Sequence, residues 1–293
     1  MKLQKAAVIG HPIGHTMSPF IQKRLFELSH IPMEYSVIDV PDLEEALPVL
    51  RKLDCFNITI PHKSAIIPYL DSMCEQAALC GSVNTVRVEE GRLWGSTTDG
   101  AGFALALACE GVDLPEDVVI LGNGGAAKAI AFQIAQRPDF QLTIVHRQGS
   151  YEKAMALADR LADYTRSRGD KSFWIQLMSY QELEEDSRGS RGLLVNTTSL
   201  GMYPHTDACP VSDAVIARFS TVFDAVYNPA DTLLLQRARR QGVKTVGGMG
   251  MLVCQAAYSH KLWYGSSFEL ADLRQLTADA QAELPQIFGG EKL

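Results

Sequence analysis

Val118-Val119-Ile120-Leu121 is followed directly by Gly122-Asn123-Gly124-Gly125-Ala126. The four residues before the glycines are all apolar, which is typical of a strand buried on both faces of a sheet. Glycines after such a strand let backbone N–H groups approach a pyrophosphate at the start of the next helix, where the helix dipole favours an anion. An alanine-rich helix, expected over residues 126–136, and a strand over 141–145 complete the unit. This order predicts the nucleotide-binding half of a doubly wound sheet.

The glycine turn has the spacing Gly-x-Gly-Gly-Ala, which is shorter than the full dinucleotide fingerprint Gly-x-Gly-x-x-Gly. An ordinary tight turn between a strand and a helix is therefore the alternative interpretation. The surrounding strand and helix favour the dinucleotide interpretation. The candidate cofactor-binding residues of this turn are Gly122, Gly124, Gly125 and Ala126.

The next strand ends in His146-Arg147-Gln148, and no acidic residue follows before Glu152. A site that prefers NAD usually places Asp or Glu here to bind the ribose 2′-hydroxyl. Arg147, with Lys153 close behind, could instead pair with a 2′-phosphate. We therefore expect NADP in preference to NAD. The alternatives are that NAD is also used, or that Arg147 is a solvated surface residue.

Composition places the chain among globular proteins with a real core, because 46% of its 293 residues are hydrophobic. Its net charge is −7 without a basic run, so nucleic-acid binding has no electrostatic support. The six cysteines form no Cys-x-x-Cys pair, which argues against a zinc site or a disulfide framework and favours the cytoplasm. No apolar run approaches the roughly 20 residues of a membrane span, and the N-terminus does not resemble a signal peptide.

The first hundred residues alternate between strand and helix patterns. Strands are expected over 6–10, 33–40 and 56–60, and a hairpin is expected over 84–95 around Glu89-Glu90-Gly91. Ser18-Pro19 predicts a helix start with serine as the N-cap. Proline and glycine between His11 and His15 make a helical metal pair unlikely to form, so we expect turn residues there.

Polar side chains follow the strand ends of this first region. Lys63 comes after the strand over 56–60, and Asp99 comes after the hairpin. A lysine in such a place is often only surface charge, and Asp99 could be a helix N-cap. Together they predict an ammonium–carboxylate pair, which could exchange a proton with an oxygen while hydride moves at carbon. Uncharged hydrogen-bonding groups suited to a polyhydroxylated ligand lie in the same segments, at Asn57, Thr59, Asn84 and Thr85.

Seven motifs in one order resemble the shikimate dehydrogenase family, including its quinate/shikimate dehydrogenase branch, over nearly the whole chain. The motifs are His15-Thr16-Met17-Ser18-Pro19, Asn57-Ile58-Thr59-Ile60-Pro61-His62-Lys63, Gly81-Ser82-Val83-Asn84-Thr85, Gly122-Asn123-Gly124-Gly125-Ala126, Asn196-Thr197-Thr198-Ser199-Leu200-Gly201-Met202, Asp224-Ala225-Val226-Tyr227-Asn228-Pro229 and Gly250-Met251-Leu252-Val253-Cys254-Gln255-Ala256. Each motif alone is weak evidence for the family, and the resemblance rests on the order in which all seven occur.

The resemblance implies two α/β domains. These are an N-terminal substrate-binding and catalytic domain over residues 1–103 and a Rossmann-like doubly wound dinucleotide-binding domain over 104–247. Helices over 248–293 would return to the substrate domain. The implied activity is the reversible, NADP-dependent reduction of 3-dehydroshikimate to shikimate in aromatic amino acid biosynthesis, the chorismate pathway. The implied partner is a small cyclic hydroxy acid, with neither nucleic acid nor membrane, and the protein would be a monomer or a homodimer.

The resemblance also implies roles for single residues. Lys63 would be the catalytic acid/base, and Asp99 would be its partner. The substrate would be bound by Thr16, Ser18, Asn57, Thr59, Asn84, Tyr227 and Gln255, with Thr16 and Ser18 at its carboxylate. The cofactor would be bound by the glycine turn and by His146, Arg147, Lys153, Thr197, Gly248 and Met251, with Met251 against the nicotinamide.

The chain departs from the family pattern at several of these positions. Thr16 stands where the family has serine, and Thr97 stands where it has asparagine. Gln22-Lys23 and His146-Arg147-Gln148 also replace the usual residues. These departures keep two alternatives open. One is a dehydrogenase for quinate or a related cyclic polyol that can use NAD, and the other is a non-catalytic metabolite-binding paralogue on the same scaffold.

Overall fold

The structure is a computed structural model that describes residues 3–14, 16–169 and 172–288. The chain divides into two compact units. Unit 1 comprises residues 1–102 and 253–293, and unit 2 comprises residues 103–252. Two helices, α5 (Asp99–Cys109) and α11 (Gly248–Tyr264), carry the chain from unit 1 into unit 2 and back again. The C-terminal part of the chain therefore belongs to the same unit as its N-terminal part, which confirms the expected return of the last helices.

Unit 1 is built on a six-stranded mixed sheet with the strand order β2-β1-β3-β5-β6-β4. Its strands are β1 (Gln4–Gly10), β2 (Met33–Asp39), β3 (Cys55–Ile58), β4 (Ser72–Met73), β5 (Thr85–Glu89) and β6 (Arg92–Ser96). Its helices are α1 (Ser18–Leu28), α2 (Leu43–Leu50), α3 (His62–Ala65), α4 (Glu75–Cys80), α12 (Leu270–Phe288) and the part of α11 from Val253 onward. Strand β5 is antiparallel to both of its neighbours, and it forms the expected hairpin with β6.

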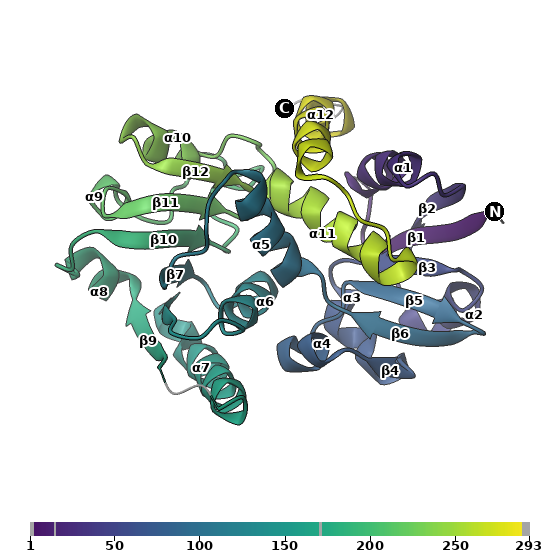
Figure 1. Cartoon of the computed structure of the whole chain (residues 1–293), viewed down its shortest axis with the longest axis horizontal. Coiled ribbons are helices and arrows are strands. Elements are labelled where there is room, and N and C mark those ends of the chain that lie inside the picture. Colours follow the sequence, from purple (N-terminus) through teal and green to yellow (C-terminus); the bar gives the residue numbers. More distant parts are fainter. Residues whose placement is uncertain (1–2, 15, 170–171, 289–293) are drawn as a thin grey trace. The chain divides into compact units, whose positions relative to one another are not determined.

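The side chains of the unit 1 strands point alternately to the two faces of the sheet, and helices cover both faces. Ala7, Ile9, Phe56 and Ile58 pack into a core with residues of α2 and α4. Their neighbours in sequence point to the opposite face, where Cys55 packs with aromatic residues of α1 and α11. Because successive strand side chains point to opposite faces, Asn57 lies on the α1 and α11 face with Cys55. Figure 1 shows the helices on the two sides of this sheet.

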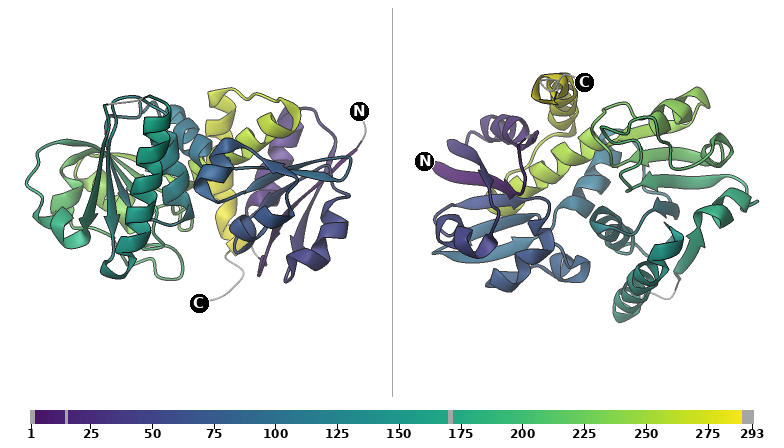
Figure 2. Two further views of the ribbon diagram at one scale, coloured as in Figure 1. Left: turned by 90° about the horizontal axis from the view of Figure 1, so that it is seen from below. Right: turned by 180° about the vertical axis from the view of Figure 1, so that it is seen from behind.

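Unit 2 is an all-parallel six-stranded sheet with the strand order β12-β11-β10-β7-β8-β9. Its strands are β7 (Asp117–Leu121), β8 (Gln141–His146), β9 (Trp174–Ser179), β10 (Arg191–Asn196), β11 (Phe219–Asp224) and β12 (Lys244–Gly247). Its further helices are α6 (Gly125–Ile134), α7 (Tyr151–Ser167), α8 (Tyr180–Glu185), α9 (Asp213–Ile216) and α10 (Leu233–Arg240). Helices α6 and α7 cover one face, and α8, α9 and α10 cover the other (Figure 2). This is the predicted doubly wound fold.

The order of the strands in unit 2 reverses at β7. The chain runs outward from β7 through β8 to β9, and then returns to β10 on the other side of β7. In open parallel sheets, ligands bind beyond the carboxyl ends of the strands at such a reversal. Gly122 follows β7 and Thr197 follows β10, so the fold brings both residues to this point.

Some local details differ from the sequence predictions. Helix α1 has Met17 at its N-cap rather than Ser18, because Ser18 already belongs to the first turn and its backbone N–H bonds to Thr16 Oγ1 at 3.2 Å. Strand β9 was not predicted. Its sequence, Trp-Ile-Gln-Leu-Met-Ser, mixes polar and apolar residues because the strand lies at the edge of the sheet, with Trp174 exposed.

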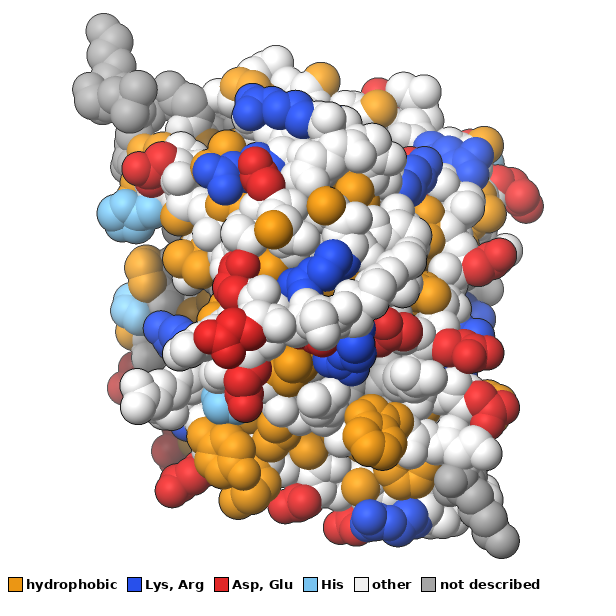
Figure 3. Space-filling view, turned by 90° about the vertical axis from the view of Figure 1, so that its left-hand side faces the viewer, with side chains coloured by type: hydrophobic (Ala, Val, Ile, Leu, Met, Phe, Trp, Pro, Cys, Tyr) orange, Lys and Arg blue, Asp and Glu red, His pale blue; other side chains and the backbone are white. Residues whose placement is uncertain are grey.

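On the face drawn in Figure 3, acidic, basic and apolar side chains are interspersed, and no basic stripe crosses it. This distribution agrees with the net charge of −7. Within the described ranges, no helix is long and apolar enough to cross a bilayer.

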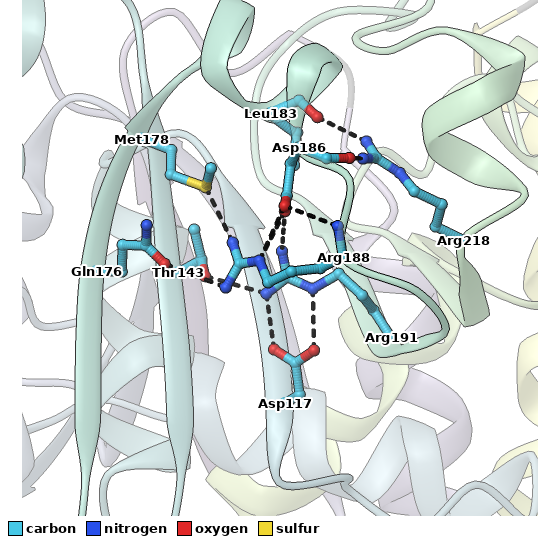
Figure 4. A network of polar contacts seen from close by, with 9 residues as sticks. All are labelled: Asp117, Thr143, Gln176, Met178, Leu183, Asp186, Arg188, Arg191 and Arg218. Carbon is cyan, nitrogen blue, oxygen red and sulfur yellow. Dashed lines mark hydrogen bonds and ion pairs between the residues drawn. The ribbon is translucent and has the colours of Figure 1, made fainter.

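A buried ion-pair network ties together the amino ends of the strands in unit 2 (Figure 4). The guanidinium of Arg191, at the start of β10, donates two hydrogen bonds to Asp117, at the start of β7, at 2.8 and 2.9 Å. It also bonds to Thr143 of β8 at 3.1 Å and pairs with Asp186 at 3.3 Å. Asp186 in turn accepts from Arg188. One buried cation thus links three neighbouring strands to the segment that follows α8.

Replacing Arg191 should destabilise unit 2 in proportion to the contacts removed. We expect Arg191→Ala to lower the free energy of unfolding by about 3–5 kcal/mol, because it leaves Asp117 and Asp186 without their shared cation. Arg191→Lys keeps the charge but loses the two-pronged contact, so we expect a loss of about 1–3 kcal/mol. Urea denaturation followed by circular dichroism measures both losses.

Arg166→Ala, which removes an exposed pair with Asp163, is the matched control and should change stability by less than about 0.5 kcal/mol. Equal effects at Arg191 and Arg166 would contradict a structural role for the network.

Candidate active site

Lys63 and Asp99 form an ion pair in unit 1, with Nζ 2.8 Å from Oδ2. Lys63 lies in α3, just after β3, and Asp99 is the first residue of α5, just after β6. Strands β3 and β6 are both antiparallel to β5, so they run in the same direction and end at the same edge of the sheet. Helix α3 is held there because Val83 N–H donates to the Lys63 carbonyl at 2.7 Å. The sheet topology thus explains why residues 36 positions apart meet.

Asn84 fixes the second oxygen of Asp99. This residue precedes β5 and is almost fully buried. Its Nδ2 donates to Asp99 Oδ1 at 2.7 Å and lies 3.0 Å from Thr98 Oγ1. Its Oδ1 accepts from the Thr98 backbone N–H at 2.9 Å. Both carboxylate oxygens of Asp99 therefore have partners, and the carboxylate is oriented toward Lys63.

Gln255 of α11 joins the same group of side chains. Its Oε1 lies 3.3 Å from Asn84 Nδ2 and 3.2 Å from Thr98 Oγ1. Helix α11 can approach α5 this closely because residue 102 is glycine. A Cβ atom at Gly102 would lie 2.6 Å from the Cβ of Gln255. The close packing of two helices thus brings an amide from the C-terminal part of the chain to Asn84 and Thr98, beside Asp99.

The other expected substrate residues of unit 1 lie in or directly after β3 and at the start of α1. Asn57, in β3, is buried, and its Nδ2 lies 3.5 Å from the Asn84 carbonyl. Thr16 and Ser18 place their hydroxyl oxygens 3.2 Å apart at the start of α1, where a helix end favours an anion. Thr59 directly follows β3. Among the described residues, no side-chain hydrogen bond joins Thr16, Ser18 or Thr59 to Lys63 or Asp99.

Unit 2 contains a pocket of about 550 Å³ at the point where the strand order reverses. The expected residues Gly122, Gly124, Arg147 and Thr197 line it. Gly122 has a φ of +101°, and a Cβ there would lie 3.0 Å from Thr197 Oγ1. Only glycine adopts this backbone without strain, so the turn between β7 and α6 depends on it. Helix α6 begins at Gly125, so its free backbone N–H groups lie at this turn.

The remaining residues that line this pocket were not among the expected cofactor residues, although four of them lie within the quoted motifs. They are Asn123, Ser150, Tyr180, Thr198, Ser199, Leu200 and Pro210. Asn123 carried a usable signal, because it lies inside the glycine turn, and its side chain donates to the Ser150 carbonyl at 2.9 Å. Tyr180 and Pro210 gave no such signal in the sequence. They are far from the glycine turn along the chain, and only folding brings them to the pocket. Burial raises the pKa of the Tyr180 phenol, so its hydroxyl keeps its proton.

Further expected cofactor residues do not line this pocket. Lys153 is exposed on α7, and His146 is buried at the end of β8, with Nδ1 3.1 Å from the Arg147 carbonyl. Gly248 begins α11 and Met251 lies buried within it, both on the unit 2 side of that helix. Ala126 lies in the first turn of α6.

Asp224 is the last residue of β11, and its hydrogen bonds fix the segment after this strand, which includes Tyr227. Its buried carboxylate accepts hydrogen bonds from Asn196 Nδ2 at 2.9 Å, from the Val226 N–H at 3.0 Å and from Thr232 Oγ1 at 2.6 Å. Burial raises the pKa of Asp224 to about 6, although these three bonds lower it. Burial also raises the pKa of Tyr227, so its phenol remains a hydrogen-bond donor.

The raised pKa of Asp224 predicts a pH-dependent stability. Between the ordinary carboxyl pKa and about 6, the folded protein holds a proton that the unfolded chain has released. The stability that this proton contributes is complete at low pH and is lost as pH rises through about 6. Asp224→Asn removes this titration, so relative to the variant, wild type should lose about 1–2 kcal/mol between about pH 5 and about pH 7.5.

Thermal or urea unfolding of both proteins at the two pH values measures this difference. Asp163→Asn is the matched control, because the Asp163 side chain is 80% exposed on α7. That control should follow wild type at both pH values. A constant difference between wild type and Asp224→Asn across this range would contradict the account.

The described ranges contain no group of three or more His, Cys, Asp or Glu side chains placed to hold a metal ion. His11 forms a hydrogen bond with Asp39 at 2.6 Å, and His15 lies outside the described residues.

Comparison with known proteins gives concordant matches. A sequence model of the shikimate dehydrogenase substrate binding domain matches residues 8–86. A shikimate dehydrogenase (NADP⁺) of Caldanaerobacter subterraneus subsp. tengcongensis is 39% identical over 271 residues, which cover 89% of this chain and 92% of that protein.

Two crystal structures resemble the whole chain. A shikimate 5-dehydrogenase from Thermus thermophilus, in complex with NADP(H) and shikimate, is 29% identical with a TM-score of 0.82, covering 94% of this chain and 99% of its own. A shikimate 5-dehydrogenase from Listeria monocytogenes, in complex with shikimate and NAD, is 28% identical with a TM-score of 0.82, covering 94% and 96%.

Proposed function

The chain belongs to the shikimate dehydrogenase family, and we propose that it interconverts 3-dehydroshikimate and shikimate with NADP(H), with Lys63 and Asp99 as its acid–base pair. The observation that carries this proposal is the 2.8 Å ion pair between Lys63 and Asp99, held by Asn84. The identity of 39% to a shikimate dehydrogenase (NADP⁺) over most of both chains supports the activity and the cofactor.

Lys63 donates and accepts the proton of the reaction. In the direction of reduction, its ammonium donates a proton to the carbonyl oxygen of 3-dehydroshikimate as hydride arrives at the carbonyl carbon. In the direction of oxidation, the neutral amine accepts the proton of the shikimate hydroxyl as hydride leaves that carbon. NADP(H) supplies or accepts the hydride. Asp99 orients the amine, because its two carboxylate oxygens are fixed by Lys63 and Asn84. Its negative charge also compensates the positive charge of the ammonium.

The substrate is held by uncharged side chains of unit 1. Asn57, Thr59, Asn84 and Gln255 supply amide and hydroxyl groups for the ring hydroxyls, and Asn84 and Gln255 already belong to the Asp99 group. Thr16 and Ser18 bind the substrate carboxylate with two adjacent hydroxyls at the start of α1. Tyr227, on unit 2, keeps the substrate-binding role that family membership implies. Unit 1 is therefore the substrate-binding unit.

Unit 2 is the dinucleotide-binding unit. The residues of its pocket fit such a ligand, because Gly122, Gly124 and the first turn of α6 offer backbone N–H groups to phosphates. The exposed guanidinium of Arg147 borders the same pocket and suits a 2′-phosphate. Gly125, Ala126, His146, Lys153, Thr197, Gly248 and Met251 keep the cofactor roles expected of them. NAD remains an alternative cofactor, since a structural relative was crystallised with it.

Quinate or a related cyclic polyol is the second candidate substrate. Thr16 adds a methyl group beside the hydroxyl that would meet the substrate carboxylate. Thr97, two residues before Asp99, has a buried Oγ1 without a hydrogen-bond partner among the described residues. Both positions depart from the family pattern. A cytoplasmic location is also proposed, since no disulfide joins the cysteines of the described chain.

Steady-state kinetics with shikimate and quinate, each with NADP⁺ and NAD⁺, test the proposed function. We expect the highest kcat/KM for shikimate with NADP⁺. A preference for shikimate over quinate of more than about tenfold corresponds to about 1.4 kcal/mol and excludes the second candidate as the main activity. Absence of turnover with every combination would overturn the proposed function.

A further inference from the structure

A chain of buried polar side chains lies behind Asn57, on the α1 and α11 face of the unit 1 sheet. His260 of α11 places Nε2 2.8 Å from Gln22 Oε1 of α1. Gln22 Nε2 donates to Asn57 Oδ1 at 2.9 Å, and the Tyr35 hydroxyl donates to the same oxygen at 2.9 Å. Asn57 Nδ2 then lies 3.3 Å from Ser259 Oγ. We refer to these five residues as the Asn57 relay.

The partners of Asn57 determine the direction of every hydrogen bond in the relay. Ser259 Oγ donates to the Gln255 carbonyl at 3.0 Å, so it accepts from Asn57. The second neighbour of Asn57 Nδ2 is the Asn84 carbonyl, which can only accept. The amide nitrogen of Asn57 therefore points toward Asn84 and Ser259, and Oδ1 points away from them. No alternative flip of this amide satisfies both acceptors.

The same logic fixes the tautomer of His260. Because Asn57 Oδ1 must accept, Gln22 presents its Nε2 to Asn57 and its Oε1 to His260. His260 Nε2 must then carry a hydrogen, and Nδ1 carries only its lone pair. Nδ1 is buried and has no hydrogen-bond partner within the described ranges, so protonation would place an unpaired N–H and a charge there. Burial accordingly lowers the pKa of His260 to about 3.

The surroundings of His260 are aromatic, which keeps the imidazole neutral. Its ring centroid lies 4.2 Å from that of Phe26, and Trp263, Tyr264 and Phe268 also flank the ring. Burial raises the pKa of Tyr35 well above its ordinary value, so its phenol keeps the hydrogen that it donates to Asn57. The relay thus holds one pattern of hydrogens around neutral pH.

We propose that His260, Gln22 and Tyr35 are positioning residues that fix the amide of Asn57 and, through Asn57 and Ser259, the backbone of Asn84 and Gln255. The inference rests on the proposed function, in which these last two residues bind the substrate. With Oδ1 occupied by two donors, Asn57 does not accept from a substrate hydroxyl. A ligand oxygen binds Asn57 only at Nδ2, by taking the N–H that otherwise faces the Asn84 carbonyl at 3.5 Å.

The relay has consequences that simple packing of His260 would not have. Loss of the His260 donor frees the Gln22 amide to turn, and Asn57 Oδ1 then keeps Tyr35 as its one fixed donor, so the Asn57 amide is held less firmly. The effect should appear in the KM for shikimate and not in the KM for NADP⁺. It should also vanish when Asn57 itself is removed, because His260 acts through that side chain.

The experiment is a double-mutant cycle between His260→Phe and Asn57→Ala. In the wild-type background we expect His260→Phe to raise the KM for shikimate about three- to tenfold, as for the loss of one buried hydrogen bond. In the Asn57→Ala background the same change should alter it less than about twofold. Gln22→Met, which removes both hydrogen bonds of the Gln22 amide at nearly constant volume, should behave like His260→Phe. Equal effects in both backgrounds would overturn the proposal.

A control and an independent readout separate the outcomes. Tyr264→Phe removes a hydroxyl from the same aromatic cluster, bonded to Cys55 outside the relay, and should leave the KM for shikimate unchanged. Nitrogen-15 NMR of histidine-labelled wild-type protein should show His260 as the Nε2–H tautomer, unchanged from about pH 5 to about pH 8. The opposite tautomer, or titration in this range, overturns the relay even if no turnover is found. Lack of wild-type turnover alone overturns only the proposed function.

Discussion

The ion pair between Lys63 and Asp99 requires two segments to meet at one edge of the unit 1 sheet, and much of that unit follows from this requirement. Strands β3 and β6 must run in the same direction, which the antiparallel β5 between them provides. Asn84, at the start of β5, then lies at the same edge and binds the second oxygen of Asp99. A carboxylate held on both oxygens cannot turn away from the amine, so the pair is oriented before any ligand arrives.

In unit 2, the buried ion-pair network and the proposed cofactor pocket lie at opposite ends of one parallel sheet. Arg191 and Asp117 stand at the first residues of β10 and β7, and their buried contact ties together the amino ends of the strands. Gly122 and Thr197 stand just beyond the carboxyl ends of the same two strands, where they line the pocket. The buried network can therefore anchor the sheet without involving the glycine turn, to which we assign the proposed phosphate contacts.

Local patterns predicted the fold well, because apolar runs and glycine turns are properties of short segments. The strand before Gly122 and the hairpin around Gly91 are examples. The sequence also placed Lys63 and Asp99 at strand ends, but it could not show that Asn84 joins them. The Gln22–His260 contact spans 238 residues, and no local pattern indicates it. Strand β9 was not predicted, because an edge strand need not alternate regularly between apolar and polar residues.

The proton-transfer role of Lys63 is the central claim, and the most direct test is the kinetics of shikimate oxidation by Lys63→Ala. At saturating shikimate and NADP⁺, the account predicts that kcat falls by about 10²–10⁴, which is the usual contribution of a positioned acid or base. The KM for shikimate should change far less, because the amine acts mainly in the transition state. A variant that keeps most of its kcat and loses only affinity for shikimate would contradict the account and make Lys63 a binding group.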